Sequence, residues 1–334
     1  MNGEELTHHK VNASQAHNCT FILLHERGSS GADLCRALCA ELTSNNTTIA
    51  SVLPGARFVF PDGPLAAAEG GRDWYGLEDP GEECAEQASW DQWRHVAYAA
   101  EQIDMIVADE ADIIGRENVF IGGVGKGCAV AMFALLEMEM AIGGFLGFGG
   151  WMPFVRDVKD VATLGAIDSP LHPSALQDAQ SLRPSPLRNE VLAEDAMDWQ
   201  PGNDDIAVDP SLLTSQQPPP PPALLDDQSQ QARLQRVTNF LRQFEWVNHE
   251  EWAESTSVKT PVFLVHAHHD TTVEFSHSKE AQQTLKELGF DAKLNVLQAG
   301  GHDVSHEALQ EFLTMIVSGQ TGPWMDIMGS VLSF

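Results

Sequence analysis

Basic residues are scarce in this chain. It has 19 Lys and Arg against 48 Asp and Glu, which gives a formal net charge of −29. Nucleic acids and anionic membrane surfaces are bound through basic patches. We therefore expect neither nucleic acid nor an anionic membrane as a partner, and we interpret the acidity as a well-solvated surface.

Long apolar runs and paired cysteines are also missing. No apolar run approaches the roughly 18 residues of a membrane span, and the first ten residues contain no apolar segment of a signal peptide. The five cysteines are odd in number and include no Cys-x-x-Cys pair. Reduced thiols fit this pattern best. We expect a cytoplasmic protein without a membrane span.

Strands and helices are predicted to alternate. Their pattern favours an α/β fold with a mostly parallel sheet and helices on both faces. In such sheets the functional residues collect beyond the carboxyl ends of the strands. The predicted strands are 20–24, 57–60, 119–121, 143–148, 261–265 and 292–297; the predicted helices are 32–42, 90–114, a segment ending near 140, 232–244, 276–288 and 304–317.

The composition divides the chain into a domain and less regular segments. The α/β domain is predicted at 19–154 and 232–319, after a loose N-terminus at 1–18. Residues 155–231 have little apolar periodicity, are rich in Asp, Ser, Gln and Pro, and include five consecutive prolines at 218–222. We predict a disordered insertion there, acting as a spacer or as the binding segment for a protein partner. Residues 320–334 form a C-terminal tail without a clear pattern.

A glycine cluster follows the apolar strand 119–121. A strand, a tight glycine turn and a helix make up a nucleophile elbow, whose motif is Gly-x-Ser-x-Gly. Here the frame reads Gly123-Val124-Gly125-Lys126-Gly127. The outer glycines are present, but position 125 is glycine and carries no nucleophile.

Seven segments, taken in order, resemble the phospholipase/carboxylesterase family of α/β hydrolases, whose best-known members are acyl-protein thioesterases. The first reads Phe-Ile-Leu-Leu-His-Glu-Arg-Gly-Ser-Ser-Gly at 21–31, and the fifth reads Gly-Gly-Trp-Met-Pro at 149–153. Each segment alone is a weak signal, whereas seven in family order are specific at the family level. The others are 57–64, 74–75, 122–129, 261–270 and 300–302.

The resemblance implies roles for particular residues. Asp270 and His302 match the family's acid and base, which activate an elbow serine toward an ester or thioester carbonyl. The backbone N–H groups of Arg27 and Lys126 match its oxyanion hole. No metal and no cofactor are implied. Trp74 and Trp151 are candidate substrate-binding residues, although packing beneath the site is the favoured interpretation of both.

Two positions depart from the family. Gly125 stands where the resemblance implies serine, and Glu26 stands where it implies glycine beside the oxyanion hole. A carboxylate at position 26 would repel a developing oxyanion if it pointed inward; the alternative is that it points to solvent. Gly149 also stands where relatives often carry serine.

Other groups could replace the missing serine. Cys128, Ser29 and Ser30 are nearby in sequence, and a water activated by His302 is a further route. The rival interpretation is a metal site, because His266-x-His268-x-Asp270 is part of a zinc-hydrolase motif and His302 and His306 have ligand spacing. Position 271 is threonine, which leaves that motif incomplete.

Three functions follow as hypotheses. The first is a carboxylesterase or acyl-thioesterase homologue with lost or much reduced hydrolysis, which binds an acyl ester or thioester ligand. The second is an active hydrolase that uses an unrecognised nucleophile or a His302-activated water. The third is a non-enzymatic interaction protein that works through the insertion.

Overall fold

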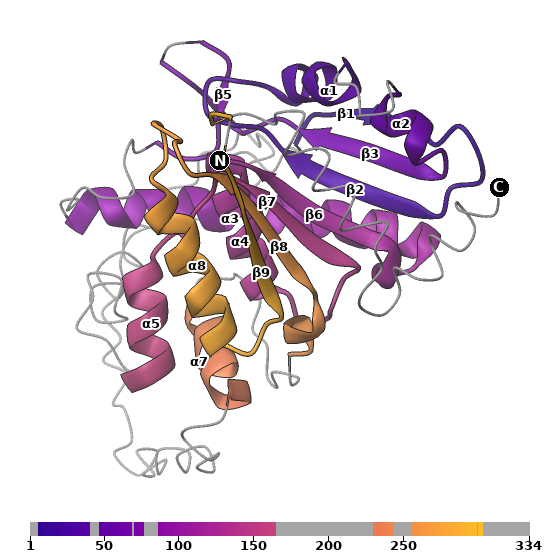
Figure 1. Ribbon diagram of the computed structural model, residues 1–334. Coiled ribbons are helices and arrows are strands. Elements are labelled where there is room, and N and C mark those ends of the chain that lie inside the picture. Colours follow the sequence, from indigo (N-terminus) through magenta and orange to yellow (C-terminus); the bar gives the residue numbers. More distant parts are fainter. Residues whose placement is uncertain are drawn as a thin grey trace, which may run out of the picture.

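A twisted, mostly parallel sheet forms the centre of the protein (Figure 1). The computed structural model describes residues 6–40, 47–68, 70–76, 86–164, 230–242, 255–298 and 300–302. The seven strands of this sheet are ordered β1-β3-β2-β6-β7-β8-β9. The edge strand β1 runs antiparallel to β3, and every other pairing is parallel. The strands are β1 His8–Val11, β2 Cys19–Leu24, β3 Ala56–Pro61, β6 Val119–Val124, β7 Gly144–Phe148, β8 Val262–Ala267 and β9 Ala292–Leu297.

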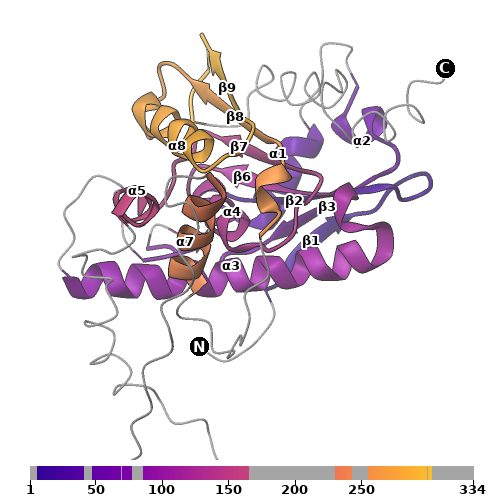
Figure 2. The same ribbon diagram turned by 90° about the horizontal axis from the view of Figure 1, so that it is seen from below.

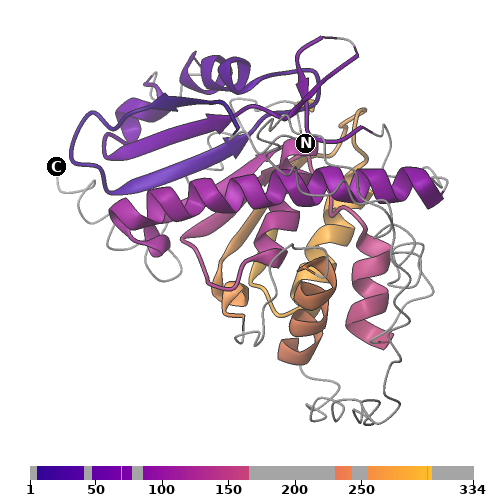
Figure 3. The ribbon, with the colours of Figure 1, turned by 180° about the vertical axis from the view of Figure 1, so that it is seen from behind.

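Helices cover both faces of this sheet, as the alternating pattern predicts. On one face lie α1 (Gly31–Ala40) and the short α2 (Ile49–Val52). The larger set on the other face includes the long α3, which runs across the sheet, below it in Figure 2 and in front of it in Figure 3. That set is α3 Glu86–Ile114, α4 Lys126–Glu137, α5 Val155–Leu164, α7 Gln230–Arg242 and α8 Phe275–Glu287.

The central strands are buried on both sides. In β2, Ile22 and Leu24 pack into the core beneath α3 and α4, while Phe21 and Leu23 pack into the core beneath α1. The ring of Phe21 stacks on that of Phe120, with centroids 4.8 Å apart. Strands buried on both faces read as continuous apolar runs, which is why β2 and β6 were recognisable from sequence.

Several short elements complete the described part. A two-stranded ribbon joins β4 (Leu65–Ala66) to β5 (Arg72–Asp73). Two 3-10 turns, η1 (Arg116–Asn118) and η3 (Ser257–Lys259), precede β6 and β8. Among the described helices, none is long and apolar enough to cross a membrane.

Two boundary predictions were wrong. The N-terminus is not loose throughout 1–18, because His8–Val11 forms β1; its side chains are mostly exposed, so an edge strand here needs no apolar pattern. The insertion does not begin at 155, because Val155–Leu164 forms α5.

Helix α5 explains the second error. Among its residues of described burial, Val158, Val161 and Ala162 are buried, and this short apolar stripe does not stand out from the polar segment that follows. The rest of the predicted insertion (165–229), the predicted helix at 304–317 and the tail at 320–334 lie outside the described residues.

Candidate active site

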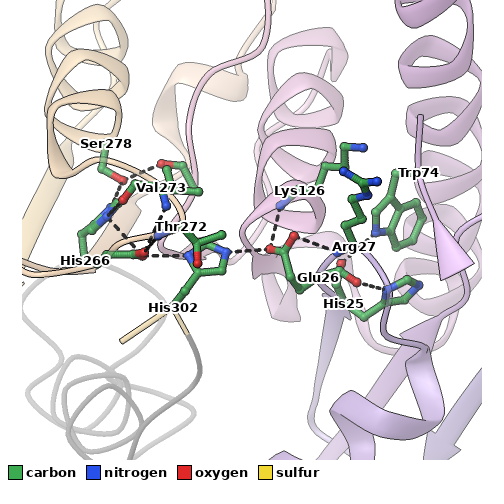
Figure 4. A network of polar contacts seen from close by, with 12 residues as sticks. His25, Glu26, Arg27, Trp74, Lys126, His266, Thr272, Val273, Ser278 and His302 are labelled. Atoms are coloured by element: carbon green, nitrogen blue, oxygen red, sulfur yellow. Dashed lines mark hydrogen bonds and ion pairs between the residues drawn. The ribbon is translucent and has the colours of Figure 1, made fainter. Parts of the chain in front are cut away.

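Four loops meet beyond the carboxyl ends of the parallel strands (Figure 4). Glu26 follows β2, Gly125 follows β6, Asp270 follows β8, and His302 lies beyond β9. Strand pairing places β2 beside β6, and β7 joins β6 to β8. Residues separated by up to 276 positions are therefore brought into contact.

Gly125 forms the tight turn between β6 and α4. Its φ of 48° and ψ of −113° are left-handed values that favour glycine, and Lys126 begins the helix directly after it. A Cβ at this position would overlap Oε2 of Glu26 and would lie 2.6 Å from Nε2 of His302. The space next to the turn is therefore already taken by the Glu26 carboxylate.

The carboxylate of Glu26 points inward. Its Oε1 accepts the backbone N–H of Arg27 at 2.8 Å, and its Oε2 accepts the backbone N–H of Lys126 at 3.0 Å. Lys126 is the first residue of α4, where the helix dipole favours negative charge. The carboxylate therefore points inward rather than to solvent, and it binds both predicted oxyanion-hole donors.

His25 holds the backbone of Glu26 in place. Its Nε2 accepts the N–H of Gly63 at 2.9 Å, so its Nδ1 donates to the carbonyl of Glu26, 2.6 Å away. Burial lowers the pKa of His25 and keeps the ring neutral, although nearby acidic groups oppose the shift. The indole of Trp74 donates to the carbonyl of His25 at 2.8 Å, which fixes the start of this loop from below.

One carboxylate also fixes the side chains of the two N–H donors. Both oxygens of Asp73 lie 3.0 Å from Nζ of Lys126, and Oδ2 lies 3.6 Å from Nε of Arg27. Lys126 donates further to the carbonyl of Tyr75 at 2.7 Å. Burial lowers the pKa of Lys126, and Asp73 opposes that shift. The two donors are thus held by a common anchor, which sequence reasoning missed because Asp73 lies in a short strand without a motif.

Asp270 and His302 form a direct pair. Nδ1 of His302 donates to Oδ2 of Asp270 at 2.7 Å, while Oδ1 accepts the N–H groups of Thr272 and Val273 at 2.8 and 3.0 Å. Burial alone would raise the pKa of Asp270, but these N–H groups and His302 outweigh burial and lower it. Asp270 is therefore ionised and orients the imidazole.

The other nitrogen of His302 faces Glu26. Nε2 lies 2.9 Å from Oε2 of Glu26, so the ring is sandwiched between two carboxylates. Burial would lower the pKa of His302, but hydrogen bonds to Glu26 and Asp270 raise it to about 9. The ring is consequently an imidazolium at neutral pH and donates from both nitrogens.

His266 has a supporting place behind this pair. Its Nδ1 lies 2.6 Å from Oγ of Ser278, and its Nε2 lies 2.9 Å from the carbonyl of Val273 and 3.4 Å from Oδ2 of Asp270. Within the described ranges, no group of three or more His, Cys, Asp or Glu side chains is arranged to hold a metal ion. His306 lies outside the described residues.

The structure separates the other candidates from the reacting position. Trp74 is fully buried and Trp151 is 8% exposed, so both fit the packing interpretation; substrate contact by either stays a prediction. Cys128 is fully buried, and burial raises the pKa of its thiol to about 12. Oγ of Ser30 bonds the side chain and backbone of Asp33 at the start of α1. Neither Cys128 nor Ser30 is therefore placed as a replacement nucleophile.

Gly149 is the second glycine whose conformation matters here. Its φ is 54°, and a Cβ there would lie 3.1 Å from Nδ1 of His302 and 3.2 Å from Oδ2 of Asp270. A side chain at this position would press on the Asp270–His302 hydrogen bond. Glycine leaves that pair room, which gives a local reason for its presence.

A small depression lies beside His302. It is open to solvent, and the space inside it is about that of one water molecule. His302 lines it and is 11% exposed, whereas Glu26, which is 27% exposed, is not among the lining residues. The lining residues are Val124, Phe148, Gly149, Val265, Ala267, Leu297, Gly301 and His302.

The family model described as "Phospholipase/Carboxylesterase" matches residues 7–174 and 229–318, which is more than half of the chain. The chain belongs to this family. The resemblance found in the sequence is thereby confirmed, and so is the α/β-hydrolase fold. The gap in the match, at 175–228, falls within the predicted insertion.

Two curated relatives are named acyl-protein thioesterase 1. The one from Schizosaccharomyces pombe is 27% identical over 183 residues, covering 51% of this chain and 77% of the relative. The one from Yarrowia lipolytica is 26% identical over 150 residues, covering 43% of this chain and 62% of the relative.

Solved structures agree on the fold. The esterase PE8 covers 93% of this chain and 99% of its own, with a TM-score of 0.55 and 18% identity. Zea mays acyl-protein thioesterase 2 covers 93% of this chain and 98% of its own, with a TM-score of 0.50 and 14% identity. At these identities the likeness concerns the fold alone.

Proposed function

We propose that this chain is a carboxylesterase/acyl-thioesterase homologue that binds acyl esters or thioesters and hydrolyses them at a much reduced rate. The observation that carries the proposal is the position of the Glu26 carboxylate, hydrogen-bonded to both N–H groups of the predicted oxyanion hole. Gly125 adds to it, because the turn that would carry a serine carries no side chain.

The two departures act on different parts of ester hydrolysis. Loss of a triad serine removes the covalent route and leaves about 10³–10⁴-fold rate enhancement over water. An occupied oxyanion hole removes most of that remainder, since each lost donor costs about 10²–10³-fold. Glu26 also places a negative charge where the tetrahedral oxyanion would form.

A His302-activated water is the weaker alternative. To accept a proton from water, the imidazole must be neutral, and its pKa is raised to about 9 by Glu26 and Asp270 despite burial. Nε2 is also engaged by Oε2 of Glu26 at 2.9 Å. An interaction role for the proline-rich segment concerns residues outside the described part and stays a separate hypothesis.

Ester hydrolysis by five proteins tests the proposal. The substrates are a short p-nitrophenyl ester and an acyl thioester. The proteins are the natural chain, His302→Ala, Gly125→Ser, Gly125→Ser/Glu26→Gly, and that double variant with His302→Ala added. We expect near-background rates from the natural chain. We expect only a weak gain from Gly125→Ser, because the serine Cβ would overlap the Glu26 carboxylate.

The double variant should gain a further 10²–10³-fold over Gly125→Ser, because both N–H donors become free for the oxyanion. Adding His302→Ala should abolish the gain. Turnover by the natural chain that is lost with His302→Ala alone would overturn the proposal. Ligand binding is checked separately: a non-hydrolysable acyl amide should raise the melting temperature of the natural chain more than the free fatty acid does, because Glu26 repels a carboxylate.

A further inference from the structure

We propose that Cys35 and Cys39 form a two-coordinate site for a soft metal ion, and that Cu(I) is the ion it fits best. Both thiols lie on α1, which packs against β1 and β3 on the face of the sheet opposite α3 and α4 (Figure 1). The inference goes beyond ester chemistry and does not depend on the proposed function. It rests on the juxtaposition of two half-buried thiols, four residues apart, on one helix.

Helix α1 places the two thiols side by side. Residues four positions apart on a helix share a face, with their Cβ atoms about 5–6 Å apart. Leu34 and Leu38 are buried in the core beneath α1, whereas the side chain of Arg36 is 74% exposed. Cys35 and Cys39 lie between these two faces of the helix. Both thiols are therefore half-buried and can still be reached from solvent.

The two thiols also interact directly. Burial, the neighbouring Cys35 thiol and a hydrogen bond to that thiol together raise the pKa of Cys39 to about 11. The two sulfur atoms are therefore within hydrogen-bond reach of each other. This is the arrangement that a single bridging ion requires, provided that the ion displaces the thiol protons.

A disulfide is a poor fit for this pair. It needs Cβ atoms about 3.5–4.5 Å apart. Positions four apart on a helix keep their Cβ atoms about 5–6 Å apart, so α1 would have to distort to close the bond. A bridging ion removes this constraint, because two metal–sulfur bonds of about 2.3 Å each allow the sulfur atoms to be up to about 4.6 Å apart.

The number and type of ligands select the ion. Thiolates are soft ligands that favour Cu(I) and Zn²⁺, but a structural zinc site takes four ligands. In the part of the chain that the structure describes, no group of three or more His, Cys, Asp or Glu side chains is arranged to hold a metal ion. The acidic side chain of α1, Asp33, is engaged by Ser30 and Arg36. Cu(I) is stable with two thiolates in a linear arrangement, so it needs no further ligand.

Binding exchanges protons for the ion. Cu(I) forms one bond to each sulfur, and each thiol releases its proton to solvent, which leaves an anionic dithiolate complex. No electron is transferred, and no other reagent is consumed. Because protons compete with the ion for the sulfurs, the affinity for Cu(I) should rise with pH.

Titration of the reduced full chain with Cu(I) tests this site. The titration is done under argon in competition with the chromogenic chelator bicinchoninate, and native mass spectrometry counts the bound ions. We expect one ion per chain, bound by two sulfurs in the X-ray absorption spectrum, with an affinity that rises between pH 6 and pH 8. Cys35→Ser and Cys39→Ser should each weaken binding by about 100-fold or more, because a single thiolate loses the chelate advantage.

Variants of the other cysteines are the matched controls. Cys19→Ala and Cys128→Ala remove thiols that are buried in the core, and Cys84→Ser removes a thiol outside the described residues. All three should bind Cu(I) as the natural chain does, and circular dichroism checks that each variant is folded. The proposal is overturned if Cys35→Ser or Cys39→Ser keeps the natural affinity, if the natural chain takes no Cu(I) from the chelator, or if a folded control variant loses the ion.

Discussion

Two glutamates at opposite ends of the sheet show how differently a carboxylate can be held. Glu110 lies against the first residues of β2 and β3, where it accepts from Thr20 at 3.0 Å and Arg57 at 2.9 Å and pairs with Lys10 at 3.3 Å. Glu26 lies beyond the far end of β2, where its partners are two backbone N–H groups and His302.

The partners decide what each carboxylate can do. Burial would raise the pKa of Glu110, but Thr20, Arg57 and Lys10 lower it, and the side chain is only 2% exposed. Glu110 therefore links α3 to three strands through fixed hydrogen bonds and ion pairs. Glu26 is 27% exposed and faces a titratable ring, so its contacts can be exchanged during a reaction. A carboxylate held by the main chain and a histidine is suited to chemistry, and one held by charged side chains is suited to stability.

The largest expected effect is on catalysis. In the Gly125→Ser/Glu26→Gly background, Asp270→Asn should lower kcat for the p-nitrophenyl ester by about 10⁴-fold, the loss known for the equivalent change in another triad hydrolase. The reason is that the amide cannot hold the tautomer and orientation that Oδ2 imposes on Nδ1 of His302 at 2.7 Å.

Glu110→Gln in the same background should leave kcat unchanged, because Glu110 lies at the other end of the sheet. Steady-state kinetics of both variants checks this contrast. A comparable loss from Glu110→Gln would break the distinction between the two ends of the sheet.

Substitution of Glu110 should instead affect the stability of the fold. Glu110→Ala should lower the free energy of unfolding by about 3 to 4 kcal/mol, because Arg57 and Thr20 lose a buried partner. Urea denaturation at pH 7 measures the effect. A loss of less than about 1 kcal/mol in the free energy of unfolding would show that water replaces the carboxylate and that Glu110 does not stabilise the fold.

The pH dependence of stability sharpens the comparison further. The pKa of His302 is raised to about 9 in the folded protein, against an ordinary value of 6.5. Protonated His302 therefore contributes about 3 kcal/mol to the free energy of unfolding. This contribution is complete below pH 6.5 and disappears as the pH rises through 9. The groups facing the ring are Glu26, Asp270 and His266.

Urea denaturation of the natural chain and His302→Gln between pH 6 and 10 isolates this contribution. The difference between the two proteins should shrink as the pH rises. A constant difference would mean that His302 has the same pKa in the folded and unfolded chains, contrary to its position between two carboxylates.

The smallest expected effect is that of Glu26→Ala on stability. We expect a change of about 1 kcal/mol at pH 7, because Asp270 keeps its share of the interaction with His302 and solvent can reach the freed N–H groups. The same urea experiment compares it with Glu110→Ala. A loss as large as that of Glu110→Ala would place Glu26 among the structural residues.

Sequence patterns predicted the parts of this fold that depend on burial. The strands β2, β6 and β7 were found within three residues of their ends because they are continuous apolar runs. The edge strand β1 and the helix α5 were missed because they bury few side chains. Pattern reasoning detects buried surface, and both elements have little of it.

The candidate site divides in the same way. The order of Gly125, Asp270 and His302 could be read from sequence because each follows a strand in family order, and the structure brings all three together. The direction of the Glu26 side chain could not be read from sequence, because a change of rotamer alone turns its carboxylate from solvent to the oxyanion hole. Asp73 and His25 were also missed, because they act through contacts with Lys126 and the Glu26 backbone that no local spacing encodes.

The most direct test of the central claim is the titration of His302 by NMR in the natural chain and in Glu26→Gln. If the Glu26 carboxylate occupies the oxyanion hole and faces Nε2, the pKa of His302 is about 9 in the natural chain and falls clearly in the variant. An unchanged pKa in Glu26→Gln, or an ordinary pKa near 6.5 in the natural chain, would contradict the inward position of Glu26 and the function proposed from it.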